Sequence, residues 1–240
     1  MKLMITGATS GIGKQLALGY AKAGHQVIAC GRSQTKLDDL TEAQPNISTL
    51  CFDLMQYDSY PALAADHGPL DLLILNAGDC EYIDDALNFD AERFDKIINI
   101  NLIAIGYALQ AWLPNLKPGG RLVLVSSSAQ LLALPRAEAY GASKAGLSYL
   151  AKVLAIDLAK HQIEVTLVHP GFVQTPLTDR NTFVMPMMIG AEEAASTIMR
   201  GIAKGKRDIR FPRLFIWLMQ SLSLLPFSLW RRLAMRMVSP

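Results

Sequence analysis

The stretch that decides the fold is Thr-Gly-Ala-Thr-Ser-Gly-Ile-Gly at residues 6–13, which follows the apolar run 3–5. We expect Gly7 to permit a sharp turn, Gly11 to leave room for a pyrophosphate, and Gly13 to bring the next helix close to the strand. N–H groups at the start of that helix would face the phosphates. A tight connection between strand and helix that binds no ligand would also explain the glycines. The functional interpretation predicts a dinucleotide site at Gly7, Ser10, Gly11, Ile12 and Gly13.

Short apolar runs alternate with helical patterns along most of the chain. Runs 72–75 and 122–125 are continuously apolar, which is typical of strands covered on both faces. We therefore predict an α/β fold, a Rossmann-like doubly wound parallel sheet of about seven strands with helices on both faces. Strands are expected at 2–5, 26–30, 47–52, 71–75, 121–125 and 164–168, and helices at 13–23, 34–43, 59–65, 91–113, 139–160 and 191–204.

The 240 residues are predicted to form one catalytic domain and a tail. Hydrophobic residues make up 51% of the chain and only three residues are cysteines, which excludes a disordered or disulfide-stapled protein. No linker or repeat interrupts residues 1–205, so we assign them to one dinucleotide-binding domain. The alternation stops after Pro170-Gly171, and the irregular segment 172–190 is predicted to be a substrate loop. Residues 206–240 form the tail.

The cysteines and the N-terminal residues indicate the cellular compartment of the protein. Cys30, Cys51 and Cys80 are far apart, with no CxxC pair and no His at metal-ligand spacing, so we expect thiols and no metal site. The apolar run 3–5 is too short for a secretory signal. We predict a cytoplasmic protein, with peripheral attachment to the inner face of the membrane as the alternative.

Charge is unevenly divided along the chain. Residues 1–203 carry a net charge of −5 and residues 204–240 a net charge of +7. Residues 214–230 are uncharged, but a span needs roughly 20 apolar residues and Pro226 divides the run. Beyond Pro226, helical spacing predicts one apolar face formed by Phe227, Trp230, Leu233, Ala234 and Met237.

Three interpretations of the tail remain open. Basic helices with aromatic apolar faces lie in anionic lipid interfaces, so we favour contact between residues 211–240 and an anionic membrane surface. The tail could instead cover the substrate pocket or form a subunit interface, or span a membrane. Nucleic-acid binding is not expected, because the cations are interleaved with apolar residues rather than displayed on a polar stripe.

The residues after the second expected strand bear on cofactor choice. Gly31-Arg32-Ser33 stands where an acidic residue would bind the ribose of NAD. Glycine at that position, next to a guanidinium and a hydroxyl, suits a 2′-phosphate. Arg32 could instead be a solvated surface charge. We favour NADP(H) over NAD(H), with Arg32 and Ser33 as ligands.

A tyrosine and a lysine mark the candidate catalytic site. Tyr140 and Lys144 are four residues apart, hence on one face of a helix. A nearby ammonium lowers the pKa of a phenol, which would let Tyr140 exchange a proton with an alcohol or carbonyl oxygen. Such a pair is common on ordinary helix surfaces. Ser126-Ser127-Ser128 strengthens the interpretation, since it ends a strand where ligand groups collect.

Seven motifs stand in order along the chain. They are the glycine turn at 6–13, Asp53-Leu54, Asn76-Ala77-Gly78, Asn101, the serines at 126–128, Tyr140-x3-Lys144, and Pro170-Gly171-x-Val173-x-Thr175. Together they make the chain resemble the single-domain short-chain dehydrogenases/reductases over roughly residues 2–200. One departure is Leu75, where the family usually has a first Asn.

The resemblance implies a role for each matching residue. Tyr140 would be the catalytic acid/base, Lys144 its pKa-lowering partner and a ribose ligand, and Asn101 the holder of a water that relays protons from Lys144. Ser127, which lies 13 residues before Tyr140, would donate to the substrate oxygen. Further cofactor contacts would come from Asp53 and Leu54 at the adenine, from Asn76, Ala77 and Gly78, and from Pro170, Gly171, Val173 and Thr175 near the nicotinamide.

These expectations combine into one function and one alternative. The chain is predicted to be an NADP(H)-dependent oxidoreductase that exchanges hydride with a carbonyl or secondary alcohol, on an apolar or lipid-like substrate. The alternative is a dinucleotide-binding sensor or scaffold without turnover. The resemblance also implies a homodimer or homotetramer.

Overall fold

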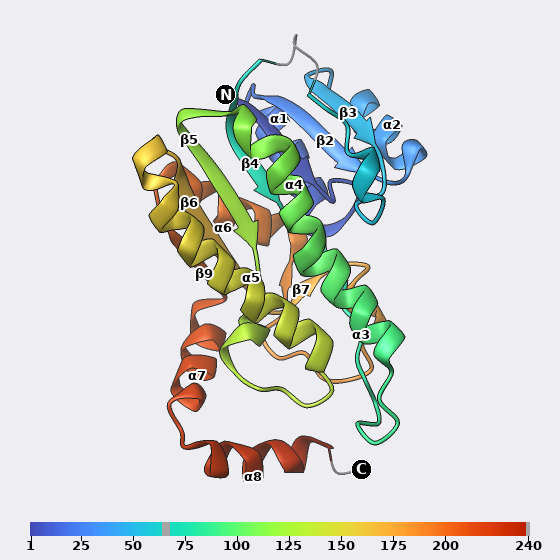
Figure 1. Cartoon of the computed structure of the whole chain (residues 1–240), viewed down its shortest axis with the longest axis vertical. Helices are drawn as coiled ribbons and strands as arrows, with labels where there is room; N and C mark the ends of the chain where they lie inside the picture. The colour runs from blue at the N-terminus through green and yellow to red at the C-terminus, as the bar shows by residue number, and fades with distance from the viewer. Residues whose placement is uncertain (64–67, 239–240) are drawn as a thin grey trace.

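The computed structural model describes residues 1–63 and 68–238, and its centre is one parallel sheet (Figure 1). Seven strands lie in the order β3-β2-β1-β4-β5-β6-β9, and every pairing is parallel. The strand order reverses between β1 and β4, which confirms the predicted doubly wound class. The strands are β1 (Lys2–Thr6), β2 (Gln26–Gly31), β3 (Ile47–Cys51), β4 (Leu70–Leu75), β5 (Leu116–Val125), β6 (Glu164–Pro170) and β9 (Asp208–Phe211).

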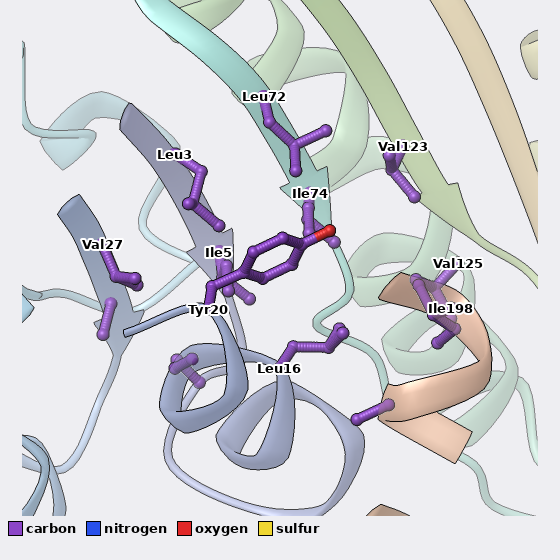
Figure 2. Packing of buried hydrophobic residues seen from close by; sticks show 14 of the residues in the cluster. Leu3, Ile5, Leu16, Tyr20, Val27, Leu72, Ile74, Val123, Val125 and Ile198 are labelled. Atoms are coloured by element: carbon purple, nitrogen blue, oxygen red, sulfur yellow. The ribbon is translucent and has the colours of Figure 1, made fainter. Parts of the chain in front are cut away.

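Helices cover both faces of the sheet, as the continuously apolar strands predict. Strand side chains alternate, so Leu3 and Ile5 of β1 join one core and Met4 joins the other. Figure 2 shows Leu16 and Tyr20 pointing from their helix toward the strands of the first core. The first core lies under α1 (Gly11–Lys22), α2 (Gln34–Ala43) and α6 (Ala191–Ala203), and the second under α4 (Ala104–Trp112) and α5 (Glu138–Asp157).

One long helical run carries a candidate site residue. It passes from α3 (Ala91–Ile98) through a π-helical turn (Asn99–Ile103) into α4. By length and composition alone, Ala91–Asn115 could cross a membrane. In this fold, however, Ile105 and Trp112 are buried against the sheet, so the run is a core helix. The π-helical turn places Asn101 at a local irregularity, a common feature of functional sites.

The predicted substrate loop 172–190 is closed at its base. Strand β7 (Val173–Gln174) pairs in parallel with β8 (Ile189–Gly190). Between them, a single 3-10 turn at Thr178–Arg180 interrupts an otherwise irregular course. The loop therefore leaves the end of β6 and returns beside it to begin α6.

The sheet continues past residue 205, where we placed the end of the catalytic domain. Strand β9 pairs with β6 and buries Ile209 and Phe211. Two helices follow, α7 (Arg213–Ser223) and α8 (Phe227–Val238), which are the red helices at the C-terminal end in Figure 1. The break between them falls at Pro226, and each is shorter than the roughly 20 residues of a membrane span.

The helix predicted at 59–65 is wrong in the part that the structure describes. A 3-10 turn covers Tyr57–Ser59, no helix follows at 60–63, and residues 64–65 lie outside the described chain. The reason is Pro61, which lacks an N–H and restricts Tyr60 to extended backbone (φ −63°, ψ 121°). The Tyr60 hydroxyl instead donates to the Leu54 carbonyl at 2.7 Å.

The apolar face predicted for α8 lies on a helix, as expected, but is only partly buried. Trp230 and Ala234 are buried against the body of the protein, whereas Phe227 and Leu233 are exposed. The side chain of Met237 lies outside the described residues. The helix touches the body along a narrow line, and its other apolar side chains face away.

Candidate active site

The glycine turn forms a cradle lined by backbone. Gly7 and Gly11 both have positive φ, +66° and +52°. A Cβ on Gly13 would lie 2.2 Å from the Gly7 carbonyl oxygen, so α1 begins directly against the end of β1. A Cβ on Gly11 would lie 2.9 Å from Cγ2 of Thr175, across the cleft. The N-terminus of α1 therefore faces a space that side chains do not fill.

Asn76 and Thr6 hold this turn in place. The Thr6 hydroxyl accepts hydrogen bonds from the N–H of Asn76 at 3.0 Å and of Ala77 at 3.1 Å. In return, Nδ2 of Asn76 donates to the Thr6 carbonyl at 3.1 Å and to the Gly7 carbonyl at 3.4 Å. The ends of β1 and β4 are thus tied together beneath the cradle, a structural reason for asparagine at position 76.

A cleft of about 510 Å³ lies at the carboxyl ends of the central strands. This is the place where open α/β sheets bind ligands, and the volume suits a cofactor. Gly13 is the one predicted cofactor residue outside the lining, since it lies beneath the turn. The predicted residues that line the cleft are Gly7, Ser10, Gly11, Ile12, Arg32, Ser33, Asp53, Leu54, Asn76, Ala77, Gly78, Ser127, Tyr140, Lys144, Pro170, Gly171, Val173 and Thr175.

Three candidate catalytic side chains meet in this cleft. Tyr140 lies in the first turn of α5, and Lys144 follows one turn later. Nζ of Lys144 lies 5.8 Å from the centre of the Tyr140 ring and donates to the Val125 carbonyl at 3.1 Å. Ser127 Oγ accepts a hydrogen bond from the Ala129 N–H at 3.1 Å, which leaves its own proton free to donate.

Ser126, next to the candidate catalytic Ser127, has a structural role. Its hydroxyl donates to the Lys144 carbonyl at 3.0 Å and lies 2.8 Å from the Ser148 hydroxyl. Ser126 thus ties β5 to α5 and fixes the spacing between the strand end and the helix that carries Tyr140.

Asn101 lies behind the cleft rather than in its lining. Its Oδ1 accepts from the Asp79 N–H at 2.9 Å, and its Nδ2 donates to the Asp79 carbonyl at 2.8 Å and to the Ser143 hydroxyl at 3.0 Å. These bonds use both hydrogens of Nδ2 and one of the two lone pairs of Oδ1. A Cβ on Gly78 would lie 2.7 Å from Asn101 Oδ1 and 3.3 Å from Lys144 Nζ, so Gly78 lets the two side chains approach.

Burial sets the protonation of the tyrosine and the lysine. It lowers the pKa of Lys144 to about 8. Burial, followed by the neighbouring Cys80 thiol, raises the pKa of Tyr140, and a hydrogen bond with Ser127 offsets part of that rise. Nζ of Lys144 donates to the Val125 carbonyl, and the lowering of the Tyr140 pKa by Lys144 stays a prediction. Tyr140 is therefore held in its protonated form, the state that donates a proton.

The far end of the cleft carries cations. Arg32 and Lys36 are both exposed and line it together with Ser33. A Cβ on Gly31 would lie 2.4 Å from Cγ2 of Thr9, so an acidic side chain does not fit there unless Thr9 moves. Lys36 was missed from the sequence, although its place in the first turn of the helix after Arg32 was a usable signal.

An ion pair fastens the substrate loop to the opposite wall of the cleft. Arg180 in the loop pairs with Asp79, which follows β4 and is itself held by Asn101. Thr178 stabilises the loop further, since its hydroxyl donates to the Val173 carbonyl at 2.7 Å and accepts from the Thr175 N–H at 3.0 Å. The Asp79–Arg180 pair was not predicted, because 101 residues separate its members.

Comparisons with known proteins agree with this geometry. A family model described as short chain dehydrogenase matches residues 2–183. An uncharacterized oxidoreductase of Myxococcus xanthus is 35% identical over 219 residues, covering 87% of this chain and 86% of the relative. L-xylulose reductase of Mus musculus is 33% identical over 183 residues, covering 75% of each.

A solved structure shares the fold. The closed form of serine dehydrogenase complexed with NADP+ superposes with a TM-score of 0.76 at 23% identity, and the match covers 88% of this chain and 94% of that one. This identity supports the architecture alone. The family model and the relatives together establish the family to which the chain belongs.

Proposed function

The chain belongs to the short-chain dehydrogenase/reductase family and is an oxidoreductase, and we propose that it transfers hydride between NADP(H) and a carbonyl or secondary alcohol. The observation that carries the proposal is the convergence of Ser127, Tyr140 and Lys144 on one cleft whose other end is the glycine cradle. A dinucleotide that bridges the two would bring its reactive ring to the catalytic side chains.

The residues present fit this cofactor. The cradle between Gly11 and Thr175 has no room for a side chain, and backbone N–H groups at the start of α1 are the donors that a pyrophosphate needs. Asp53 and Leu54 would hold the adenine, and Lys144 the nicotinamide ribose. When bound, the reduced nicotinamide supplies a hydride to the carbonyl carbon.

The protein's part in the reaction concerns the substrate oxygen. Ser127 and Tyr140 would donate hydrogen bonds to that oxygen and stabilise the negative charge that develops on it. Tyr140 would then deliver its proton to the developing oxyanion, whose basicity would drive the transfer, since burial raises the pKa of Tyr140 and makes it a weaker acid than an ordinary tyrosine. Lys144, held by the Val125 carbonyl, would place positive charge beneath the site. Asn101 would position Asp79 and Gly78 at the edge of the cleft.

The preference for NADP(H) rests on Arg32 and Lys36. Two cations and the Ser33 hydroxyl at one end of the cleft suit a 2′-phosphate, and Gly31 packed on Thr9 leaves no carboxylate to bind a ribose hydroxyl.

An apolar substrate is supported by an aromatic chain beside the site. Phe183 of the substrate loop contacts Tyr82 edge to face with ring centres 5.4 Å apart, and also contacts Phe172. Phe172 in turn contacts Phe215 of α7. Burial, followed by the neighbouring Cys80 and then Tyr140, raises the pKa of Tyr82, which places its ring near the candidate catalytic tyrosine. These rings would form an apolar wall next to the reacting carbonyl.

We further propose a homodimer built on α4 and α5. Ile103 and Tyr107 on one helical run and Tyr149, Val153 and Ile156 on its neighbour are exposed at helical spacing. A second copy of the chain would cover this stripe. Cys51 is an exposed free thiol, which fits the reducing cytoplasmic compartment that we propose for the protein.

A panel of ketones and aldehydes of graded chain length tests the function. Absorbance of NADPH should fall on addition of substrate, faster for longer apolar chains, with NADH as the control cofactor and L-xylulose as the polar control. Equal or faster turnover with NADH would refute the role of Arg32, and absence of turnover with every carbonyl would refute the proposed reaction.

A further inference from the structure

The two C-terminal helices leave a large apolar surface uncovered. We define their outer face as Leu214, Trp217, Leu218, Leu224, Phe227 and Leu233, all exposed. Trp217 is 65% exposed and Phe227 70%, which is unusual for such large apolar side chains. On α7 the exposed positions recur at helical spacing, so they form a continuous stripe. Exposed large apolar side chains concentrated on two consecutive helices in this way mark an interaction site.

The inner face of the same helices fixes their orientation. Phe215, Ile216 and Met219 of α7 and Trp230 of α8 are buried in a cluster with Leu132, which lies near the catalytic Ser127. The Trp230 indole N–H donates to the Ala133 carbonyl at 2.8 Å. The helices, which lie at the C-terminal end of the chain in Figure 1, are therefore anchored to the body through these buried side chains.

Arginines surround the outer face. Arg213, Arg231, Arg232 and Arg236 are exposed, and none of them joins an ion pair within the described chain. Residues 209–240 contain no Asp or Glu, so nothing in this segment neutralises them. Two copies meeting through this face would bring like charges together, which disfavours self-association here. An anionic partner with an apolar interior matches both properties.

We propose that the outer face of α7 and α8 docks on an anionic lipid bilayer. The helices would lie in the plane of the interface, with Trp217 and Phe227 among the acyl chains and the arginines at the phosphate headgroups. Each helix, of 11 or 12 residues, is too short to span the bilayer. The contact would bring the substrate side of the active site beside the membrane.

Vesicle flotation of the full-length protein tests the docking independently of turnover. We expect binding to vesicles of equal parts phosphatidylglycerol and phosphatidylcholine, weaker binding in high salt, and little binding to phosphatidylcholine alone. In R231Q/R232Q/R236Q, affinity should fall about 100-fold, because each cation contributes a factor of about five. In W217S/F227S, binding should be lost even in low salt.

The matched control removes the same charge elsewhere. K22Q/K160Q/K204Q replaces three exposed lysines at the ends of α1, the 3-10 turn after α5, and α6, and should bind vesicles like the wild type. NADPH binding and thermal midpoint, measured on each variant, establish that it is folded. Wild-type binding of equal strength to both vesicle types, or undiminished binding by R231Q/R232Q/R236Q, would overturn the proposal. So would a wild-type oligomer that W217S/F227S dissociates while no protein floats, since the face would then join two copies.

Discussion

The candidate active site and the C-terminal helices differ in where they carry positive charge: buried in the first, exposed in the second. Lys144 is only 4% exposed, and its ammonium has a single backbone acceptor at 3.1 Å. Arg231 and Arg232 of α8 are exposed, next to apolar side chains that are exposed as well. A buried cation lowers stability and persists where chemistry requires it, whereas exposed cations beside an apolar face favour binding to a surface. The experiments below probe this division from its largest expected effect to its smallest.

Tyr140→Phe should abolish the chemistry without loss of the cofactor. Removing the proton donor is expected to lower kcat by about 1,000-fold, a typical value for general acid catalysis. The Kd of NADPH should stay within about threefold of the wild-type value, because the ring and its packing remain. Tyr149→Phe, on the exposed side of the same helix, is the matched control and should be fully active. A kcat of Tyr140→Phe within tenfold of wild type would contradict the assigned role.

R32Q/K36Q should weaken the binding of NADPH much more than the binding of NADH. We expect the Kd of NADPH to rise about 30- to 100-fold, since each exposed charge-assisted contact with phosphate contributes about 1 to 1.4 kcal/mol. The Kd of NADH should be nearly unchanged, because it has no 2′-phosphate. Isothermal titration with both cofactors measures the difference, with Lys22→Gln as a control for net charge. Equal weakening of both cofactors would mean that the cations act on the shared pyrophosphate.

Lys144→Met should lower the activity and raise the stability of the folded protein. Burial puts the folded pKa of Lys144 near 8, below the 10.5 of an ordinary lysine, so the unfolded chain binds the proton more tightly. Below pH 8 the buried charge is a full penalty, and its removal should raise the free energy of unfolding by about 2 kcal/mol.

The advantage of Lys144→Met over wild type should shrink as pH rises from 8 toward 10.5, because the wild-type lysine then loses its proton in the folded state. Urea titrations at several pH values measure this. An advantage that does not depend on pH would show that packing, not charge, sets the difference.

Arg180→Gln should loosen the substrate loop with a small effect. An exposed ion pair contributes up to about 1 kcal/mol, so we expect KM for the carbonyl substrate to rise two- to about fivefold while kcat holds. Asp79→Asn should do the same, and the double variant should be no worse than either single one. Arg207→Gln, which removes another exposed ion pair with Glu164, is the control. Additive effects would mean that the two residues do not act through each other.

Local patterns predicted most of the sheet and many of the residues that line the candidate cleft. Each of those signals is contained in a few neighbouring residues, such as the glycines of 6–13 or the apolar run 72–75. Strand β9 was missed because Asp208–Phe211 has four residues, alternates polar and apolar, and forms only by pairing with β6. Its position explains why the sheet extends beyond residue 205.

Contacts between distant segments could not be predicted. Asp79 and Arg180 meet only because the substrate loop crosses the cleft, and no periodicity reports that. The division of α8 into a buried Trp230 and an exposed Phe227 depends on the Ala133 carbonyl, 97 residues from Trp230. The pKa of Tyr140 likewise depends on burial that the spacing of Tyr140 and Lys144 does not reveal.

The most direct test of the central claim follows the hydride itself. Wild-type protein is incubated with NADPH deuterated at C4 on the transferred face and a ketone from the active panel, and the product alcohol is examined by mass spectrometry. The account predicts one deuterium at the former carbonyl carbon in the wild type and essentially none formed by Tyr140→Phe in the same time. Alcohol product without deuterium, with NADPH labelled on either face, would contradict direct hydride transfer at this site.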